Sequence, residues 1–282
     1  MQYCLADDGT KLAYKDEGHG LPVLALAGLT RDMRDFDYLA PFLGDVRLIR
    51  LDSRGRGASQ WSGPATYTVP QEARDVLTLL DHLRLPRVAI IGSSRGGLIG
   101  LFLAATAKDR LAGLCLNDVG PVLDHAALKR ISGYIGAKPG AKTLTEMASR
   151  LQSAIPGFDG VSPQRWFEEA TRHYVQTEAG LDLPYDPDLR ISFEQALAGP
   201  DVDLWPLFDA CEGLPIALLR GRNSDLLTKT TATAMLERRP DMLFADVPDR
   251  GHIPFLDEPE SLAIIREWID MLGRGNPLQP SP

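Results

Sequence analysis

The chain has 282 residues, 44% of them hydrophobic and 24% charged, values typical of a globular protein with a sizeable core. The net charge of −8 argues against nucleic acids and anionic membrane surfaces as partners, because both are polyanions. No stretch is apolar for long enough to span a membrane, and the first residues lack the pattern of a signal peptide, so a cytoplasmic location is expected. Cys4, Cys115 and Cys211 have no paired spacing, which predicts small buried side chains rather than disulfides or a zinc site.

In chain order, an Asp-Gly turn at residues 7–10 predicts an opening hairpin. After it, short apolar runs alternate with amphipathic segments, an order that predicts a parallel sheet joined by helical crossovers. Strands are expected at 23–28, 46–52, 88–93, 111–118, 215–221 and 242–248. Helices are expected from the apolar positions between 36 and 43, and at 69–83, 95–104, 228–238 and 257–272.

The alternation is interrupted between residues 121 and 200. This region contains helical patterns at 126–134, 144–154 and 163–176, and no clear buried strand. Its seven aromatic residues are consistent with a helical cap packed over a site. We therefore predict a core domain of residues 1–120 and 201–272, a cap of residues 121–200, and a disordered tail of residues 273–282.

A Gly-x-Ser-x-Gly motif follows the strand expected at 88–93 and precedes an Ala- and Leu-rich helix. That order, strand then sharp turn then helix, is the context in which the motif presents a nucleophile. Ser94 is its central residue, and Gly92 and Gly96 allow the strand and helix backbones to approach closely. Ser93 is the other candidate, but the register of the turn centres on Ser94.

A serine hydroxyl needs a base to remove its proton and an acid to orient that base. Asp225 lies in the loop after the strand expected at 215–221, and His252 lies in the loop after the strand expected at 242–248. Asp118, at the end of the strand before the cap, is the alternative acid. Otherwise Asp118 is a hydrogen-bond acceptor at the cap hinge.

With these residues in place, the chain resembles the α/β-hydrolase superfamily over nearly its whole length. The motif at 92–96, the loop Asp52-Ser53-Arg54-Gly55-Arg56-Gly57-Ala58-Ser59, and Gly251-His252 with Asp257-x-Pro259 carry the resemblance. It implies an α/β fold with a mostly parallel eight-stranded sheet, helices on both faces and an inserted helical cap. The resemblance also implies catalysis by Ser94, His252 and Asp225.

By the same resemblance, the backbone N–H groups of Leu29 and Arg95 form the oxyanion hole. The chain departs from the family in having Ala27-Gly28 where His-Gly is common; the donor on that loop is a backbone N–H, so the hole is expected to be retained. The side chain of Arg95 has two interpretations, a structural ion pair with a carboxylate or a contact with an anionic substrate group. Asp182, Asp186 and Asp188 are expected in a solvated loop, not a metal site.

The resemblance predicts a serine hydrolase that cleaves a carboxylic ester or lactone through an acyl-enzyme, with a small molecule as its partner and with no cofactor or metal. A carbon–carbon bond hydrolase acting on a dienone-type substrate shares the triad and stays open, as does acyl transfer to an acceptor other than water. A non-catalytic ligand receptor on the same fold is the alternative from another class. The oligomeric state is open, with a homodimer among the options.

Overall fold

The computed structural model describes residues 1–200 and 202–274. Its centre is an eight-stranded sheet with the order β1-β2-β4-β3-β5-β6-β9-β10. Only β2 pairs antiparallel with its neighbours, and the other pairings are parallel. This arrangement confirms the predicted fold class. The strands are β1 (Gln2–Leu5), β2 (Lys11–Gly18), β3 (Leu21–Leu26), β4 (Val46–Leu51), β5 (Val88–Ser93), β6 (Leu111–Asn117), β9 (Ile216–Gly221) and β10 (Leu243–Val247).

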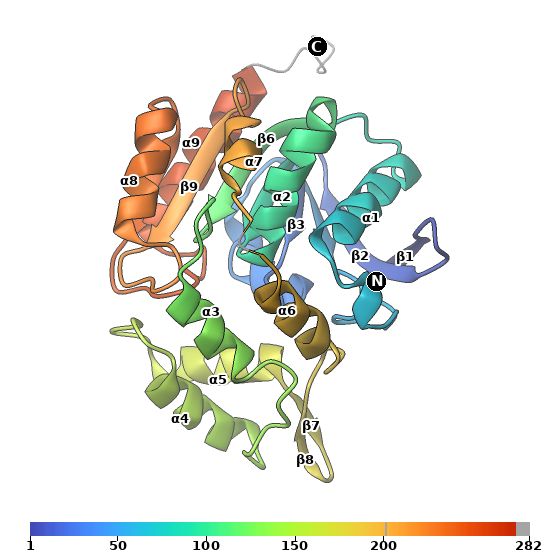
Figure 1. The fold of residues 1–282 in the computed structure, drawn as a ribbon, viewed down its shortest axis with the longest axis vertical. Coiled ribbons are helices and arrows are strands. Elements are labelled where there is room, and N and C mark those ends of the chain that lie inside the picture. The colour runs from blue at the N-terminus through green and yellow to red at the C-terminus, as the bar shows by residue number, and fades with distance from the viewer. Residues whose placement is uncertain (201, 275–282) are drawn as a thin grey trace.

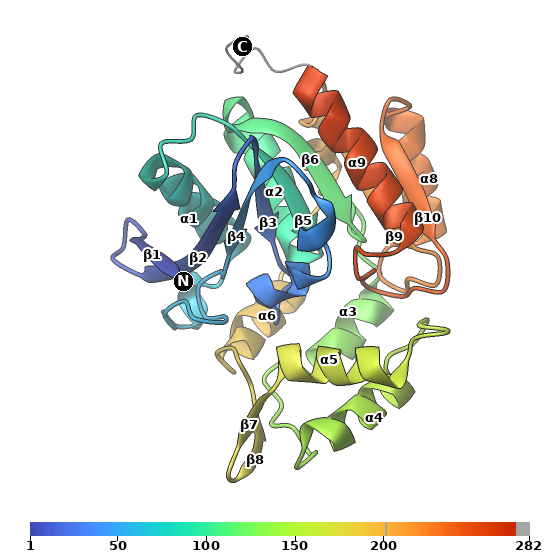
Figure 2. The same ribbon diagram turned by 180° about the vertical axis from the view of Figure 1, so that it is seen from behind.

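Helices cover both faces of the sheet (Figures 1 and 2). The apolar side chains of the central strands alternate between two buried clusters, as period-two geometry requires. One cluster is covered by α1 (Val69–His82), α2 (Arg95–Thr106), α7 (Trp205–Asp209) and α8 (Lys229–Arg238). The other is covered by the 3₁₀ helices η1 (Met33–Asp37) and η2 (Ala40–Phe42) and by α9 (Pro259–Arg274). Two further 3₁₀ turns are η3 (Pro64–Thr66) and η4 (Lys108–Arg110).

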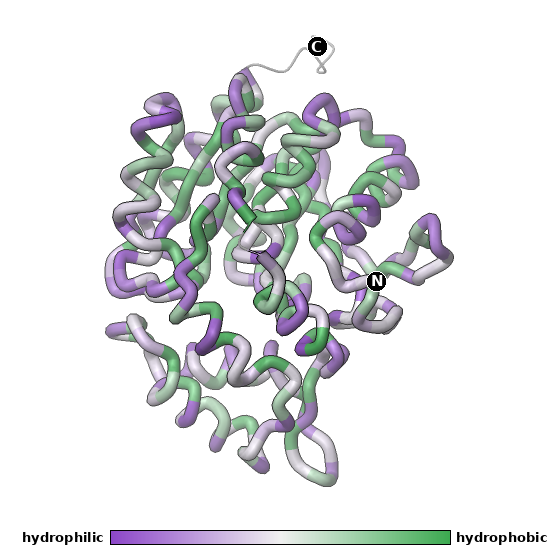
Figure 3. Tube along the Cα trace, in the orientation of Figure 1, coloured by the Kyte–Doolittle hydropathy of each residue, from purple (hydrophilic) through white to green (hydrophobic). Residues whose placement is uncertain are grey.

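The segment between β6 and α7 forms a separate layer of helices beneath the core in Figure 1. Hydropathy in Figure 3 is highest in the sheet and its covering helices, while this layer alternates polar and apolar residues. Two smaller apolar clusters hold the layer, one of them shared with Leu29 and Tyr67 of the core. Its elements are α3 (His125–Ser132), α4 (Leu144–Ala154), α5 (Pro163–His173), β7 (Val175–Thr177), β8 (Gly180–Asp182) and α6 (Leu189–Ala198).

Several local predictions differ from the structure. The helix expected between 36 and 43 is a pair of 3₁₀ turns, because Pro41 lacks the N–H that a continuous helix needs. Helix α5 ends at His173, where the chain becomes extended and pairs as the hairpin β7–β8, which sequence periodicity missed. Helix α9 continues through Arg274, so residues 273 and 274 of the predicted tail are helical; residues 275–282 lie outside the described residues.

The three cysteines are buried, as predicted from their spacing, and each is a free thiol. Within the described residues, no helix combines the length and the apolar character needed to cross a membrane.

The turn between β5 and α2 depends on two glycines. A methyl group at Gly92 would overlap the backbone of Gly96 and Gly97, and one at Gly96 would overlap the carbonyl of Leu26 on β3. Each neighbour is backbone, which cannot rotate away as a flexible side chain can. The glycines therefore allow strand and helix to approach closely at this turn.

Gly96→Ala is expected to lower the free energy of unfolding by about 1–3 kcal/mol or more, because the added methyl group forces α2 away from β3. Gly273→Ala in the last turn of α9 is the matched control, since its methyl group would meet no atom within 4 Å. Urea unfolding measures both variants. Equal stability of the two would contradict the proposed close packing.

Candidate active site

Ser94 lies at the sharp turn between β5 and α2. Its φ of 49° and ψ of −113° are strained for a residue with a side chain. Its backbone is held by hydrogen bonds on both sides, from Ser94 N to the Asn117 carbonyl at 3.0 Å and from Gly97 N to the Ser94 carbonyl at 2.9 Å. The hydroxyl is therefore presented at the edge where the parallel strands end.

His252 lies in the loop after β10. Its Nε2 is 3.0 Å from the Ser94 Oγ. The loop is braced by Glu258, which accepts hydrogen bonds from the backbone N–H groups of Phe255 at 2.8 Å and Leu256 at 3.0 Å. The Asn117 amide adds a bond of 3.1 Å to the Pro254 carbonyl. The imidazole is thus held at a fixed position beside the hydroxyl.

The carboxylate that contacts His252 belongs to Asp118, which directly follows β6. Its Oδ2 lies 2.8 Å from His252 Nδ1 and accepts a hydrogen bond of 2.6 Å from the Ser224 hydroxyl. Its Oδ1 accepts from the Gly221 N–H at 2.9 Å. The carboxylate is fully buried, and these three donors compensate its burial. A carboxylate at Nδ1 favours the tautomer that leaves Nε2 free to accept the Ser94 proton.

Asp225, the acid expected from the sequence, is placed elsewhere. Its carboxylate makes two hydrogen bonds with the Arg130 guanidinium of α3, at 2.9 and 3.0 Å, and its side chain is 37% exposed. The geometry therefore places the alternative acid, Asp118, on His252 in place of Asp225. The physical reason is the direction of the loop after β9, which turns Ser224 toward Asp118 and Asp225 outward toward the cap.

Two residues that support this arrangement were missed from the sequence. Ser224 donates to the buried acid, and Asn117 links Ser93 to the histidine loop, with its amide 3.0 Å from the Ser93 Oγ. Ser93 is therefore occupied in a structural contact. The only signal in the sequence is position, because each lies next to a candidate acid, Asp225 and Asp118 respectively.

The two residues expected to supply the oxyanion hole flank Ser94. Arg95 is the first residue of α2, where backbone N–H groups have no partner within the helix. Leu29 follows Gly28 in the loop after β3, and a methyl group added to Gly28 would lie 3.8 Å from the Ser94 Cβ. The loop carrying Leu29 therefore runs directly beside the serine. The Arg95 side chain turns away from solvent and pairs with Glu72 at 2.8 Å.

The loop after β4 contains Asp52 and Arg54, two residues of the motif at 52–59. Asp52 accepts hydrogen bonds from the backbone N–H groups of Met33 and Ala58, each at 2.8 Å, and so ties η1 to this loop. Arg54 is fully buried and pairs with Asp75 at 2.5 Å. Burial raises the pKa of Asp52 to about 6, although the two N–H groups oppose the shift.

The layer of helices between β6 and α7, which corresponds to the predicted cap, contacts the loop that carries His252. Phe158 packs against Phe255 with ring centroids 5.3 Å apart, and Arg165 pairs with Asp257 at 2.5 Å. A narrow pocket of about 20 Å³, room for about one water molecule, lies here, next to the chain neighbours of Ser94 and His252. Its lining mixes ionisable and aromatic side chains: Arg31, Asp35, Tyr38, Ser93, Glu169, Ile253, Pro254, Phe255 and Leu256.

Other polar residues singled out from the sequence have structural contacts. Asp186 is buried and accepts a hydrogen bond from the Tyr67 hydroxyl, so its loop is less solvated than expected. Asp182 accepts from the Leu183 N–H, and Asp188 precedes α6. Among the residues that the structure describes, no group of three or more His, Cys, Asp or Glu side chains could hold a metal ion.

Comparison with known protein families identifies the family of this chain. The model of the alpha/beta hydrolase family matches residues 19–264, which include the serine, histidine and both candidate acids. The chain belongs to the alpha/beta hydrolase family. The resemblance inferred from the motifs at residues 52–59, 92–96 and 251–259 is thereby confirmed.

Individual relatives agree with this assignment. The chain is 39% identical over 280 residues to a 3-hydroxybutyrate-oligomer hydrolase of Cupriavidus necator, covering 94% of this chain and 95% of the relative. It is 28% identical to the lipase LipV of Mycobacterium tuberculosis, covering 88% and 92%. A crystal structure of an alpha/beta hydrolase from Novosphingobium aromaticivorans superposes with a TM-score of 0.89 at 37% identity, covering 95% and 97%. The expectation of an ester-cleaving α/β-hydrolase is confirmed.

The raised pKa of Asp52 predicts that the stability of the protein depends on pH. The folded protein holds this proton more tightly than the unfolded chain, because the pKa is about 6 when folded against an ordinary value of 3.8. The resulting stabilisation is complete below pH 3.8 and is lost as the pH rises through about 6. Asp52→Asn stays neutral and lacks this loss. Relative to that variant, wild type should lose on the order of 3 kcal/mol between pH 4 and 7 in urea unfolding. Parallel curves for the two proteins would contradict the raised pKa.

Proposed function

We propose that this α/β-hydrolase is a serine esterase that works through an acyl-enzyme, with Ser94 as nucleophile, His252 as base and Asp118 as the orienting acid. The observation that carries the proposal is the chain of contacts from Ser94 Oγ to His252 Nε2 at 3.0 Å and from His252 Nδ1 to Asp118 Oδ2 at 2.8 Å. Contacts of this length allow proton transfer without rearrangement of the side chains.

In the first half of the reaction, Ser94 Oγ attacks the ester carbonyl while His252 Nε2 takes the hydroxyl proton. The tetrahedral intermediate collapses, its carbon–oxygen bond to the alcohol breaks, and His252 returns the proton to that alcohol. The Asp118 carboxylate accepts the hydrogen bond of His252 Nδ1 and stabilises the imidazolium formed in between. Water then repeats the sequence on the acyl-enzyme, which releases the acid and regenerates Ser94.

The negative oxygen of the tetrahedral intermediate needs two donors, for which we assign the backbone N–H groups of Arg95 and Leu29. The position of Arg95 at the start of α2 supports its assignment, since the positive end of the helix dipole faces the same point. The approach of Gly28 to Ser94 supports the assignment of Leu29.

For the substrate, we propose short polar esters of hydroxy acids, with oligomers of 3-hydroxybutyrate as the first candidate. The similarity to a 3-hydroxybutyrate-oligomer hydrolase extends over 94% of this chain, so it includes the cap as well as the core. The pocket beside the site is too small to hold a substrate chain. The charged side chains that line it, Arg31, Asp35 and Glu169 among others, suit a polar ester better than a long alkyl chain.

The two acids can be separated by matched variants. Asp118→Asn is expected to lower kcat by about 10³- to 10⁴-fold, because it no longer holds the productive imidazole tautomer. Asp225→Asn is the control and should change kcat only a few-fold, since it breaks an ion pair with Arg130 that is one-third exposed. Steady-state hydrolysis of a p-nitrophenyl ester measures both. The opposite ranking would return the role of acid to Asp225.

The proposed function itself is tested with Ser94→Ala and a panel of substrates. Wild type should react covalently with a fluorophosphonate probe and hydrolyse 3-hydroxybutyrate dimers and trimers faster than long-chain esters, lactones or dienone-type carbon–carbon substrates. Ser94→Ala should keep the fold by circular dichroism and lose both labelling and turnover, whereas Ser93→Ala should remain labelled. A wild-type protein that binds these esters without labelling or turnover would be a receptor.

A further inference from the structure

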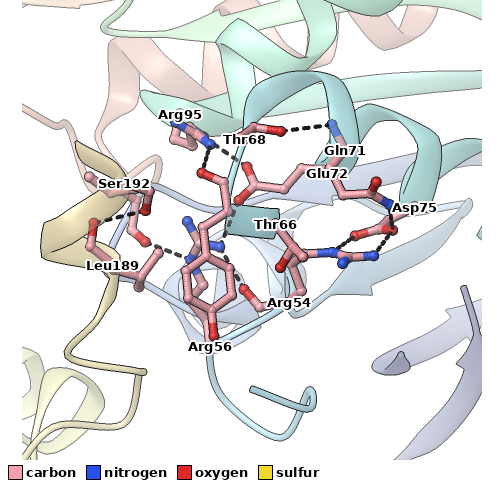
Figure 4. Close-up of polar contacts among 12 residues, drawn as sticks. Arg54, Arg56, Thr66, Thr68, Gln71, Glu72, Asp75, Arg95, Leu189 and Ser192 are labelled. Atoms are coloured by element: carbon pink, nitrogen blue, oxygen red, sulfur yellow. Dashed lines mark hydrogen bonds and ion pairs between the residues drawn. The ribbon is translucent and has the colours of Figure 1, made fainter. Parts of the chain in front are cut away.

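Glu72 is a fully buried carboxylate on α1 that the proposed reaction does not use, and Figure 4 shows it between two arginines. Its Oε1 accepts a hydrogen bond of 2.7 Å from Arg56 Nη1, and its Oε2 accepts one of 2.8 Å from Arg95 Nε. Burying the Glu72 carboxylate and the Arg56 guanidinium, with Arg95 only partly exposed beside them, is costly and is sustained only where each charge has close partners. A cluster of this kind therefore calls for an explanation.

Arg56 connects Glu72 to the first proposed oxyanion donor. Its Nε donates to the Leu29 carbonyl at 2.7 Å, and its side chain is 1% exposed. The loop after β3 forms neither helix nor strand at this point. The guanidinium therefore fixes the Leu29–Thr30 peptide, which is joined through the Leu29 Cα to the peptide that carries the Leu29 N–H. Leu29 is thereby tied to Glu72 through one rigid side chain.

Arg95 connects Glu72 to the second proposed donor. Its backbone N–H is the one assigned to the oxyanion hole, while its own side chain is anchored by Glu72 and by the Tyr67 carbonyl at 3.0 Å. Leu29 and Arg95 lie far apart in the sequence, since Leu29 follows β3 and Arg95 begins α2 after β5. Glu72 is the group to which both are linked.

The cluster also carries charge. Although burial raises the pKa of Glu72, Arg56 and Arg95 bring it below its ordinary value, so the carboxylate is ionised. The ionised carboxylate thus makes a charged hydrogen bond to each arginine, and each bond holds one side chain next to a proposed oxyanion donor.

We propose that Glu72 is a positioning residue that holds the two oxyanion-hole N–H groups at their working separation through Arg56 and Arg95. This inference rests on the proposed serine esterase function. Oxyanion donors act within a narrow range of distances from the negative oxygen, so a small displacement of either peptide weakens binding of the transition state more than binding of the ester.

The experiment compares Glu72→Gln with Asp75→Asn. Asp75 lies one turn further along α1, is equally buried and pairs with Arg54 at 2.5 Å. Its carboxylate accepts hydrogen bonds from Arg54 and Gln71 and, unlike that of Glu72, from neither Arg56 nor Arg95. Glu72→Gln should lower kcat about 10- to 100-fold with little change in KM. It should also lower the affinity for an alkyl boronic acid by a similar factor, because the boronic acid forms a tetrahedral adduct with the serine that resembles the intermediate. Asp75→Asn should lower the melting temperature and leave kcat and boronate affinity within about twofold.

Arg95→Met provides a second variant if Glu72→Gln fails to fold, because its side chain is partly exposed and its N–H is retained. It should lower kcat and boronate affinity together, by less than Glu72→Gln. In the double variant the two losses should not add, since both act through one link.

The inference is overturned if Glu72→Gln loses stability but keeps kcat and boronate affinity, or if Asp75→Asn loses them to the same extent. If Glu72→Gln does not fold, the inference is overturned when Arg95→Met keeps the kcat of the wild type. These results concern a wild-type enzyme that hydrolyses esters and reacts with fluorophosphonate. A wild type without labelling or turnover refutes the serine esterase proposal itself, and the inference with it.

Discussion

The constraint on which this protein depends is the parallel direction of β3, β5, β6, β9 and β10, which places all their carboxyl ends at one edge of the sheet. Residues scattered from position 29 to position 252 meet there without any long connecting structure. The glycines of the turn at Ser94 allow strand and helix to close tightly at this edge. The segment from α3 to α6 is inserted after β6, and it contacts the loop of His252 at the same edge through Phe158 and Arg165.

Much of this arrangement could be read from the sequence, because strand ends are recognisable. The Gly-x-Ser-x-Gly turn located Ser94, and the order of strands located His252. The choice between Asp118 and Asp225 could not be read, because both follow a strand of the same sheet edge. It depends on the path of a loop of four or five residues, which turns Ser224 inward and Asp225 outward, and no periodicity encodes such a path.

The errors in secondary structure have a similar origin. The core helices were predicted to within a few residues, because their apolar faces pack on a large sheet. In the cap, the hairpin β7–β8 has three residues per strand, which is too short to show alternation, and α6 has only one buried residue, Leu189. The cluster around Glu72 was missed for another reason. Buried charges look like surface charges in a sequence, and only tertiary contacts with Arg56 and Arg95 distinguish them.

The contact between Ser224 and Asp118 has a consequence for the length of the loop after β9. The Ser224 hydroxyl donates to the Asp118 carboxylate at 2.6 Å, and Asp225 is the next residue in the chain. A shift of this loop by one position would bring the Asp225 carboxylate against Asp118 in place of the hydroxyl. Two neighbouring buried carboxylates would repel each other and raise the pKa of one of them, so an insertion or deletion in this loop would disturb the ionic state of the carboxylate beside the imidazole.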